Sequence, residues 1–277
     1  MRALGHRTTH NVSTKPHHAR PLGTFDHLGI VSLRPGGLLH AVTYTTNYHY
    51  DRSWYLGHLW SLAVEEQFYM LWPALLLLLG RGRGLALAAL FVVAAPFVRI
   101  ATLKLGLGPQ AGIGESFQTV GDSIAAGCLL AGFRKRLEAS TLYMKLLDSP
   151  AFVLVPATAV ACAFVPYTSV DLLVGMTVQN LAIAATVHHA IRHHESMVGR
   201  FLNARVPVYI GTLSYSLYLW QQIFLHHGEK SALDTPAPLN LAIATAAALV
   251  SFYVIEQPCS RWRERLEPHL FPKRVPA

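Results

Sequence analysis

The run HLWSLAVEEQFYMLWP, residues 58–73, opens the first long apolar segment of the chain and carries several polar groups. At about 100° per residue, four of its side chains share one stripe of a helix: His58, Ser61, Glu65 and Tyr69. The leucines that follow the proline make the segment long enough to cross a hydrocarbon core. One face of a predicted membrane helix is therefore polar, and ionisable groups in such a helix mark a functional site by default.

The composition of the whole chain is typical of a membrane protein. Of its 277 residues, 52% are hydrophobic and 14% are charged, whereas an average soluble domain has roughly 25% charged residues. Because backbone polar groups in lipid must be satisfied within the segment, long apolar blocks favour helices. The sequence predicts an all-α fold, a polytopic transmembrane helix bundle with about seven spans, near residues 59–80, 84–104, 117–133, 149–166, 171–190, 207–227 and 239–257.

Basic residues gather after the first, third, fifth and seventh predicted spans. Short loops rich in lysine and arginine stay in the cytoplasm, so this alternation predicts a multi-pass plasma-membrane protein whose C-terminal tail, residues 267–277, is cytoplasmic. The net charge of +8 is explained by this topology. The basic residues lie at the ends of apolar segments and are not mixed with exposed aromatics, so no nucleic-acid partner is expected.

Residues 1–37 are rich in His, Arg, Gly and Pro and show no helical period, so we expect an irregular basic segment outside the core domain. The predicted topology places residues 1–58 on the outer, non-cytoplasmic side of the membrane. This stretch is nevertheless basic and has no signal-peptide core that would direct its export. An odd number of additional helices before residue 58 would return the amino terminus to the cytoplasm. We therefore expect the chain to lack its first helices.

Four segments, in order, resemble the acyltransferase 3 family. They are residues 58–73, TVGDSIAAGCLL at 119–130, IGTLSYSLYLWQQ at 210–222 and FYVIEQP at 252–258, and the resemblance extends over residues 38–266. Members of this family are membrane enzymes that move acetyl or other acyl groups onto exported sugars and related acceptors. The resemblance implies a cytoplasmic acyl-CoA, acetyl-CoA above all, as donor, and a hydroxyl of an exported glycan or lipid-linked molecule as acceptor, with no bound cofactor.

The catalytic candidates are His58, Glu65 and Glu66. In the family, the histidine usually held responsible sits in the first helix after a basic residue, and no predicted span precedes residue 38 that could carry it. His58 is therefore the candidate base, because the pKa of histidine lies near neutrality. Glu65 and Glu66 would fix its tautomer or contact acceptor hydroxyls. Alternatively, both carboxylates lie close to the outer helix end and simply favour its positive dipole.

Further polar residues are candidates for substrate binding: Ser61, Tyr69, Asp122, Ser214, Tyr215, Gln222 and Glu256. Asp122 has a structural alternative, because it could pair with Arg99 of the preceding span. Glu256 could form a salt bridge to the basic tail.

The sixth predicted span carries a polar face at helical spacing, made of Gly211, Tyr215, Tyr218, Gln222 and His226. Tyr218 and Trp220 are equally well explained as interfacial anchors. Where the family commonly has a histidine after Tyr-Leu-Trp, this chain has Gln221, which cannot transfer a proton.

A histidine cluster, His188, His189, His193 and His194, includes the i, i+4 spacing of a metal pair. No HExxH motif or third ligand accompanies it, so an incidental basic loop is the favoured interpretation and no metal site is predicted. The cysteines Cys128, Cys162 and Cys259 lie far apart and predict neither a disulfide framework nor a CxxC site.

Two rival interpretations remain open. A transporter or flippase for a glycan or lipid would also line its path with intramembrane carboxylates, although no inverted repeats are evident. An inactive remnant of an enzyme is the second. In that case we expect the exposed helix faces to bind a partner that supplies the missing helices. Membrane lipid is expected as a partner as well.

Overall fold

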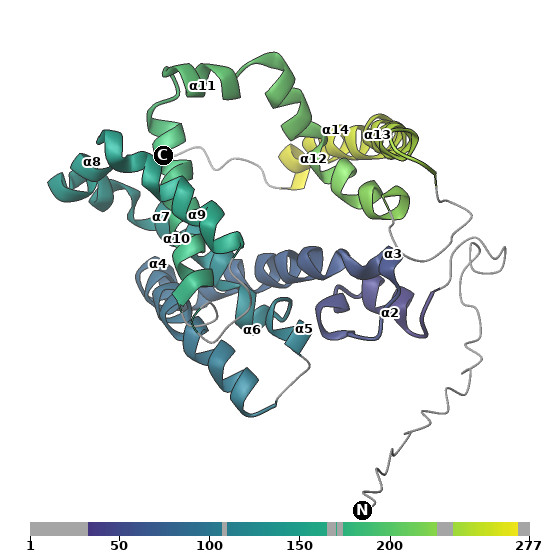
Figure 1. Cartoon of the computed structure of the whole chain (residues 1–277), viewed down its shortest axis with the longest axis horizontal. Helices are drawn as coiled ribbons and strands as arrows, with labels where there is room; N and C mark the ends of the chain where they lie inside the picture. The colour runs from purple at the N-terminus through teal and green to yellow at the C-terminus, as the bar shows by residue number, and fades with distance from the viewer. Residues whose placement is uncertain (1–32, 107–109, 165–169, 171–173, 226–234, 271–277) are drawn as a thin grey trace, which may run out of the picture.

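The computed structural model describes residues 33–106, 110–164, 170, 174–225 and 235–270, and throughout these ranges every regular element is helical (Figure 1). The predicted all-α class is thus confirmed. Most of the segment 1–37, predicted to be irregular, lies outside the described residues, as does His226 of the sixth predicted span. The first described element is α2, Gly37–Val42.

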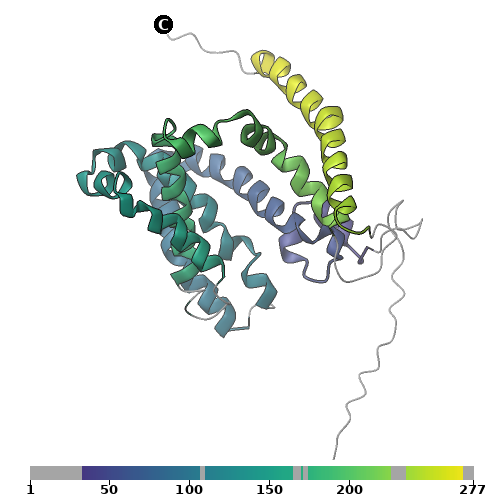
Figure 2. The ribbon, with the colours of Figure 1, turned by 45° about the horizontal axis from the view of Figure 1, so that its top comes forward.

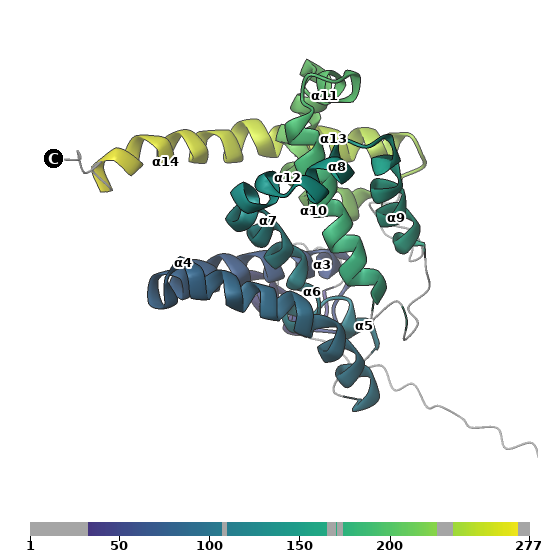
Figure 3. The ribbon, with the colours of Figure 1, turned by 90° about the vertical axis from the view of Figure 1, so that its left-hand side faces the viewer.

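The helices before the first apolar segment are short: η1, Thr46–Tyr48, and α3, Trp54–Gly57. They lead into α4, Leu59–Lys104, which consists of two arms that meet at Gly80. The backbone φ of Gly80 is +75°, a left-handed conformation that glycine adopts without a steric penalty. Figure 3 shows α4 turning back on itself. The first two predicted spans are therefore the arms of one helical hairpin.

The middle of the chain packs against this hairpin. Its elements are α5, Gln110–Ile113; α6, Phe117–Val120; α7, Asp122–Ala139; α8, Thr141–Leu147; η2, Pro150–Val153; α9, Leu154–Ala163; and α10, Met176–Arg192. Helix α7 contacts both α4 and α10, and α9 lies along α10. The core between α4 and α7 consists of Phe68, Ala88, Val92, Ala125 and Ala126.

The last helices form a second group, and Figure 2 shows α13 and α14 continuing as one long curved rod. They are α11, Met197–Leu202; α12, Arg205–Phe224; α13, Leu239–Ser251; η4, Phe252–Glu256, which has π-helical hydrogen bonding; and α14, Gln257–Leu270. Helix α12 packs along α13 and also contacts α3. The contact with α3 brings the sixth predicted span beside the start of the first.

Two helical segments among the described residues are long and apolar enough to cross a membrane, Trp54–Lys104 and Leu239–Glu267. The bent pair Thr141–Leu147 and Pro150–Ala163 would add a third if it forms one span. The seven predicted spans are not confirmed. Helix α9 has only 10 residues, fewer than the roughly 20 needed, while α7, α10 and α12 contain charged or amide side chains that reduce their apolar character.

Candidate active site

His58 occupies the junction between α3 and α4, where α12 passes over it. Its side chain is only 8% exposed, and its ring meets the Tyr218 ring edge-on, with 5.2 Å between the ring centroids. Neither ring nitrogen has a hydrogen-bond partner of good geometry among the described residues, although the Leu219 backbone interacts with the ring. A buried imidazole whose nitrogens are not committed to a structural bond retains the capacity to exchange a proton.

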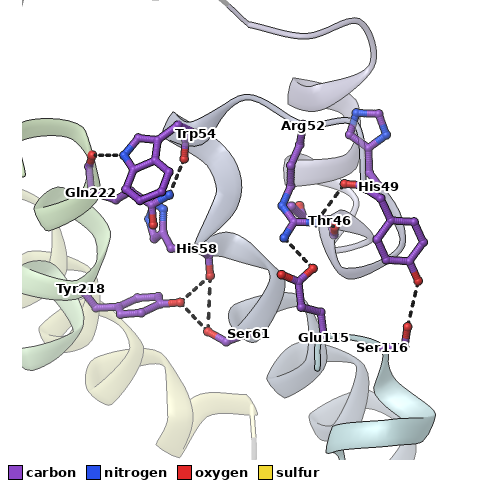
Figure 4. Close-up of polar contacts among 11 residues, drawn as sticks. Thr46, His49, Arg52, Trp54, His58, Ser61, Glu115, Ser116, Tyr218 and Gln222 are labelled. Carbon is purple, nitrogen blue, oxygen red and sulfur yellow. Dashed lines mark hydrogen bonds and ion pairs between the residues drawn. The ribbon is translucent and has the colours of Figure 1, made fainter. Parts of the chain in front are cut away.

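The Tyr218 hydroxyl links α12 to the start of α4 (Figure 4). It donates a hydrogen bond to the His58 carbonyl and lies 2.5 Å from the Ser61 hydroxyl. Because a phenol has a single proton, donation to the carbonyl leaves the Ser61 hydroxyl as the donor in the second bond. Tyr218 thus fixes the backbone of His58 to α12, which a role as a membrane-interface anchor would not require.

A second contact between the same helices lies next to His58. The Gln222 side chain donates to the Trp54 carbonyl, and the Trp54 indole donates to the Gln222 carbonyl at 3.2 Å. A side chain at Gly57 would meet this amide, because a Cβ there would lie 2.9 Å from the Gln222 nitrogen. Gln222, predicted to bind substrate, is thus engaged with the backbone of α3 in this structure.

The predicted carboxylates lie further along α4. Glu65 is exposed, Glu66 is half-buried, and Tyr69 is 57% exposed. No hydrogen bond or ion pair links either carboxylate to His58 within the described structure, so their predicted role in fixing its tautomer is not what the geometry shows. Glu65 does lie within electrostatic range of Tyr218, and both carboxylates lie within range of Tyr215.

Helix α12 presents a mixture of free and engaged polar residues to this region. Ser214 and Tyr215 are exposed, as a substrate-binding role requires. The neighbouring Ser216 is buried and donates to the Glu256 carboxylate at 2.8 Å. Glu256 therefore joins η4 to α12, and Arg261 of the following helix bonds to Gln257 instead. The salt bridge from Glu256 to the tail is not found among the described residues.

Comparison with known proteins identifies the family. Residues 24–256 match the acyltransferase 3 model, which describes an acyltransferase domain. The chain belongs to the acyltransferase 3 family. The acyltransferase 3 match spans every element of the site just described, from α3 to the end of η4.

Three curated relatives of this acyltransferase 3 chain illustrate its similarity. YrhL of Bacillus subtilis (strain 168), a proposed peptidoglycan O-acetyltransferase, is 27% identical over 224 residues, which is 73% of this chain and 34% of the relative. Proposed O-acetyltransferases of Staphylococcus aureus strains COL and N315 are each 23% identical over 256 residues, 80% of this chain and 40% of theirs. The chain thus spans about a third to two fifths of these relatives. No solved structure gives a significant match.

Asp122 lies away from the site in this acyltransferase 3 domain. Its carboxylate accepts from Arg99 at 2.5 Å, and both side chains are fully buried. Asn180 donates to the other carboxylate oxygen at 3.2 Å. Asp122 therefore has the structural pairing that was the alternative to substrate binding, and a substrate would have to break this network to reach its carboxylate.

A cap made of residues 43–53, which include η1, packs against the first arm of α4, and the sequence interpretation missed its anchors. Gln67 and Asn47 exchange amide hydrogen bonds at 2.9 and 3.2 Å. Arg52 pairs with Glu115 at 2.6 Å and donates to the His49 carbonyl at 3.0 Å (Figure 4). The signal was present, since Gln67 lies inside the family motif directly after the two glutamates.

The histidine cluster of α10 is engaged in structural contacts. His188 is buried and bonds to the Tyr143 hydroxyl at 2.9 Å, and His193 lies 3.2 Å from the Asp148 carboxylate. His189 bonds to the Leu147 carbonyl at 2.9 Å. No group of three potential ligands in the described ranges could hold a metal ion. The cluster therefore fastens α8 to α10.

Proposed function

We propose that this chain acts as a membrane O-acyltransferase that moves an acetyl group from a cytoplasmic acyl-CoA to a hydroxyl of an exported glycan or lipid-linked acceptor. The observation that carries the proposal is the buried imidazole of His58, whose ring nitrogens are not hydrogen-bonded and whose backbone carbonyl accepts from Tyr218 at the start of an apolar helix. Family membership supports acyl transfer, and the name of the Bacillus subtilis relative favours a cell-wall glycan such as peptidoglycan as acceptor.

The chemistry requires one group that accepts and then returns a proton. His58 in its neutral form takes the proton of the acceptor hydroxyl as the oxygen attacks the thioester carbonyl. The C–S bond then breaks, and the imidazolium returns the proton to the departing thiolate. Tyr218 and Ser61 act as positioning residues in this scheme, because they hold the His58 backbone and not its ring.

The acceptor is proposed to bind along the polar face between α4 and α12. On α4 the proposed face consists of Glu65, Glu66 and Tyr69, and on α12 it consists of the exposed Ser214 and Tyr215. Carboxylates accept hydrogen bonds from sugar hydroxyls, and tyrosine supplies both an apolar ring and a hydroxyl. Tyr215 lies within electrostatic range of Glu65 and Glu66, which supports one shared face.

The test is acetylation of cell-envelope glycan in membranes that contain the full chain supplied with isotopically labelled acetyl-CoA. Ester-linked acetate released by mild alkali from the purified glycan is the readout. We expect His58→Ala and His58→Gln to lower the rate about a hundredfold or more, the usual contribution of a positioned acid–base group. His194→Ala is the matched control, because this histidine follows the end of α10 and its side chain is 64% exposed.

Two results would contradict the proposal. Unimpaired acetylation by His58→Ala protein would remove His58 as the base. Translocation of a labelled glycan across sealed vesicles without acetylation would favour the transporter or flippase alternative. The amount and melting temperature of each purified variant show whether a loss of activity reflects misfolding.

A further inference from the structure

A cleft of about 710 Å³ lies where the turn of α4 meets the C-terminal half of α7, remote from His58. Four of the residues that line it are basic, namely Arg81, Arg134, Lys135 and Arg136. Its apolar lining includes Leu85, Ala86, Ala131 and Phe133. Glu138 is the acidic residue among those lining it. The cleft therefore combines an excess of positive charge with apolar side chains.

Most of the basic groups are not neutralised by protein. Glu138 is engaged by Arg134, with 3.0 Å between guanidinium nitrogen and carboxylate oxygen. Arg81 donates to the Gly132 carbonyl at 3.2 Å, and Arg136 lies over the Phe133 ring at 5.5 Å from its centroid. Throughout the described residues no carboxylate pairs with Arg81, Lys135 or Arg136. These three cations keep donors that can bind an anion.

The apolar surface of the α4 hairpin reaches the edge of the cleft. Leu77 and Leu78, just before the turn at Gly80, are 87% and 81% exposed. They belong to a segment long and apolar enough to cross a membrane. Leu77 and Leu78 are close to Arg81 in sequence, so a ligand in the cleft meets cations near a lipid-compatible surface. This pairing suits an amphiphile better than a small soluble anion.

The geometry points to the headgroup of an anionic phospholipid as the ligand, and we propose that its phosphate binds to Arg81, Lys135 and Arg136 while its acyl chains lie along Leu77 and Leu78. Arginine forks bind phosphate oxygens in a bidentate manner, which fixes the headgroup orientation. Basic pockets between membrane helices bind anionic headgroups in this way.

The experiment measures lipids retained by the full chain. Protein purified in neutral detergent is titrated with phosphatidylglycerol or phosphatidylcholine, and bound lipid is counted by native mass spectrometry. We expect a preference for phosphatidylglycerol and about a hundredfold weaker binding of it in the triple variant Arg81→Gln/Lys135→Gln/Arg136→Gln, since each basic residue contributes about a factor of five. The control Arg200→Gln/Arg205→Gln/Arg263→Gln removes the same charge outside the cleft and should retain binding.

A second variant, which should bind more lipid, keeps the test informative if the Arg81→Gln/Lys135→Gln/Arg136→Gln protein misfolds. Glu138→Gln removes the acidic residue of the cleft and releases Arg134, so we expect about fivefold tighter phosphatidylglycerol binding. Equal losses in the two triple variants would overturn the proposal, as would equal retention of both lipids. Displacement of bound lipid by millimolar inorganic phosphate or adenosine 3′,5′-bisphosphate would identify a soluble phosphate ligand and also overturn it.

Discussion

The Arg99 guanidinium donates to the Asp122 carboxylate at 2.5 Å, and neither side chain has any exposed surface. Arg99 also donates to the Thr119 carbonyl at 2.6 Å and to the Thr177 hydroxyl at 2.9 Å. This single cation therefore ties the second arm of α4 to α6, α7 and α10. Both charges are buried, and hydrogen bonds satisfy almost all of their donors and acceptors. Removal of only one of the two side chains is therefore costly, because the other charge stays buried without its partner.

We expect Asp122→Ala to lower the free energy of unfolding by about 3–5 kcal/mol, because Arg99 would remain charged, buried and without its carboxylate. The measurement is the unfolding transition in mild detergent. The free energy of unfolding lost in the double variant Arg99→Met/Asp122→Leu should be smaller than the sum of the losses in Arg99→Met and Asp122→Leu, since the double variant removes both charges. Strict additivity would show that the two side chains do not depend on each other.

The amide pair of Gln67 and Asn47 fastens the cap to α4. Gln67→Leu leaves the fully buried Asn47 side chain without its partner, which should cost about 1–3 kcal/mol. The cap should also become accessible, so limited proteolysis within residues 43–53 is the measurement. Gln221→Leu, at an exposed position of α12, is the control. Equal cleavage rates in the two variants would show that the amide pair does not hold the cap.

Tyr218→Phe removes one hydroxyl and leaves the ring packed against His58. If the proposed function holds, acetylation should fall between about tenfold and a hundredfold, because displacing the base by a fraction of an ångström is costly. The rate of ester-linked acetate formation is the measurement. Tyr253→Phe loses an exposed bond to Tyr209 and should retain activity. Full activity of Tyr218→Phe would show that the His58 backbone needs no such support.

His49 should make stability depend on pH. Burial lowers the pKa of this imidazole, and the nearby His40 and Arg52 lower it further, while Asp51 opposes them. The unfolded chain then binds a proton at His49 more readily than the folded chain does. The free energy of unfolding is therefore highest above the ordinary histidine pKa of about 6.5, and it declines as pH falls through the lower pKa of the folded state. Melting temperatures at several pH values between about 5 and 8 measure this effect.

His49→Gln should flatten that dependence, because glutamine does not titrate. His194→Gln, at an exposed position, should leave the slope unchanged. An identical slope in the native and His49→Gln proteins would assign the effect to another group.

Gly199 is a position where any side chain meets backbone. A Cβ there would lie 2.3 Å from the His194 carbonyl oxygen and 2.5 Å from that of His193. We expect Gly199→Ala to lower the free energy of unfolding by about 1–3 kcal/mol through the shift of this turn. Gly211→Ala is the matched control, because open space surrounds its Cβ position. An equal melting temperature for both variants would contradict the expected clash.

The residues of the α4 hairpin show how much of this protein could be predicted from sequence. The apolar runs on either side of Gly80 predicted two helices with a break between them, and the structure has both arms and the break. The polar stripe of residues 58–73 identified the region of the candidate site, and its motif identified the family. These features are local, because helix period, segment length and glycine conformation depend on neighbouring residues alone.

Only the tertiary structure decided which polar residues belong together. Tyr218 bonds to His58, which lies 160 positions earlier in the sequence. Ser216 donates to Glu256, and Asp122 pairs with Arg99. Among the described residues, two or three segments are long and apolar enough to cross a membrane, so the seven predicted spans are not confirmed. The sequence by itself determined where helices form and which carry polar faces. The pairing of those faces depended on how the helices pack, since hydrogen bonds and burial follow from distances that no local pattern contains.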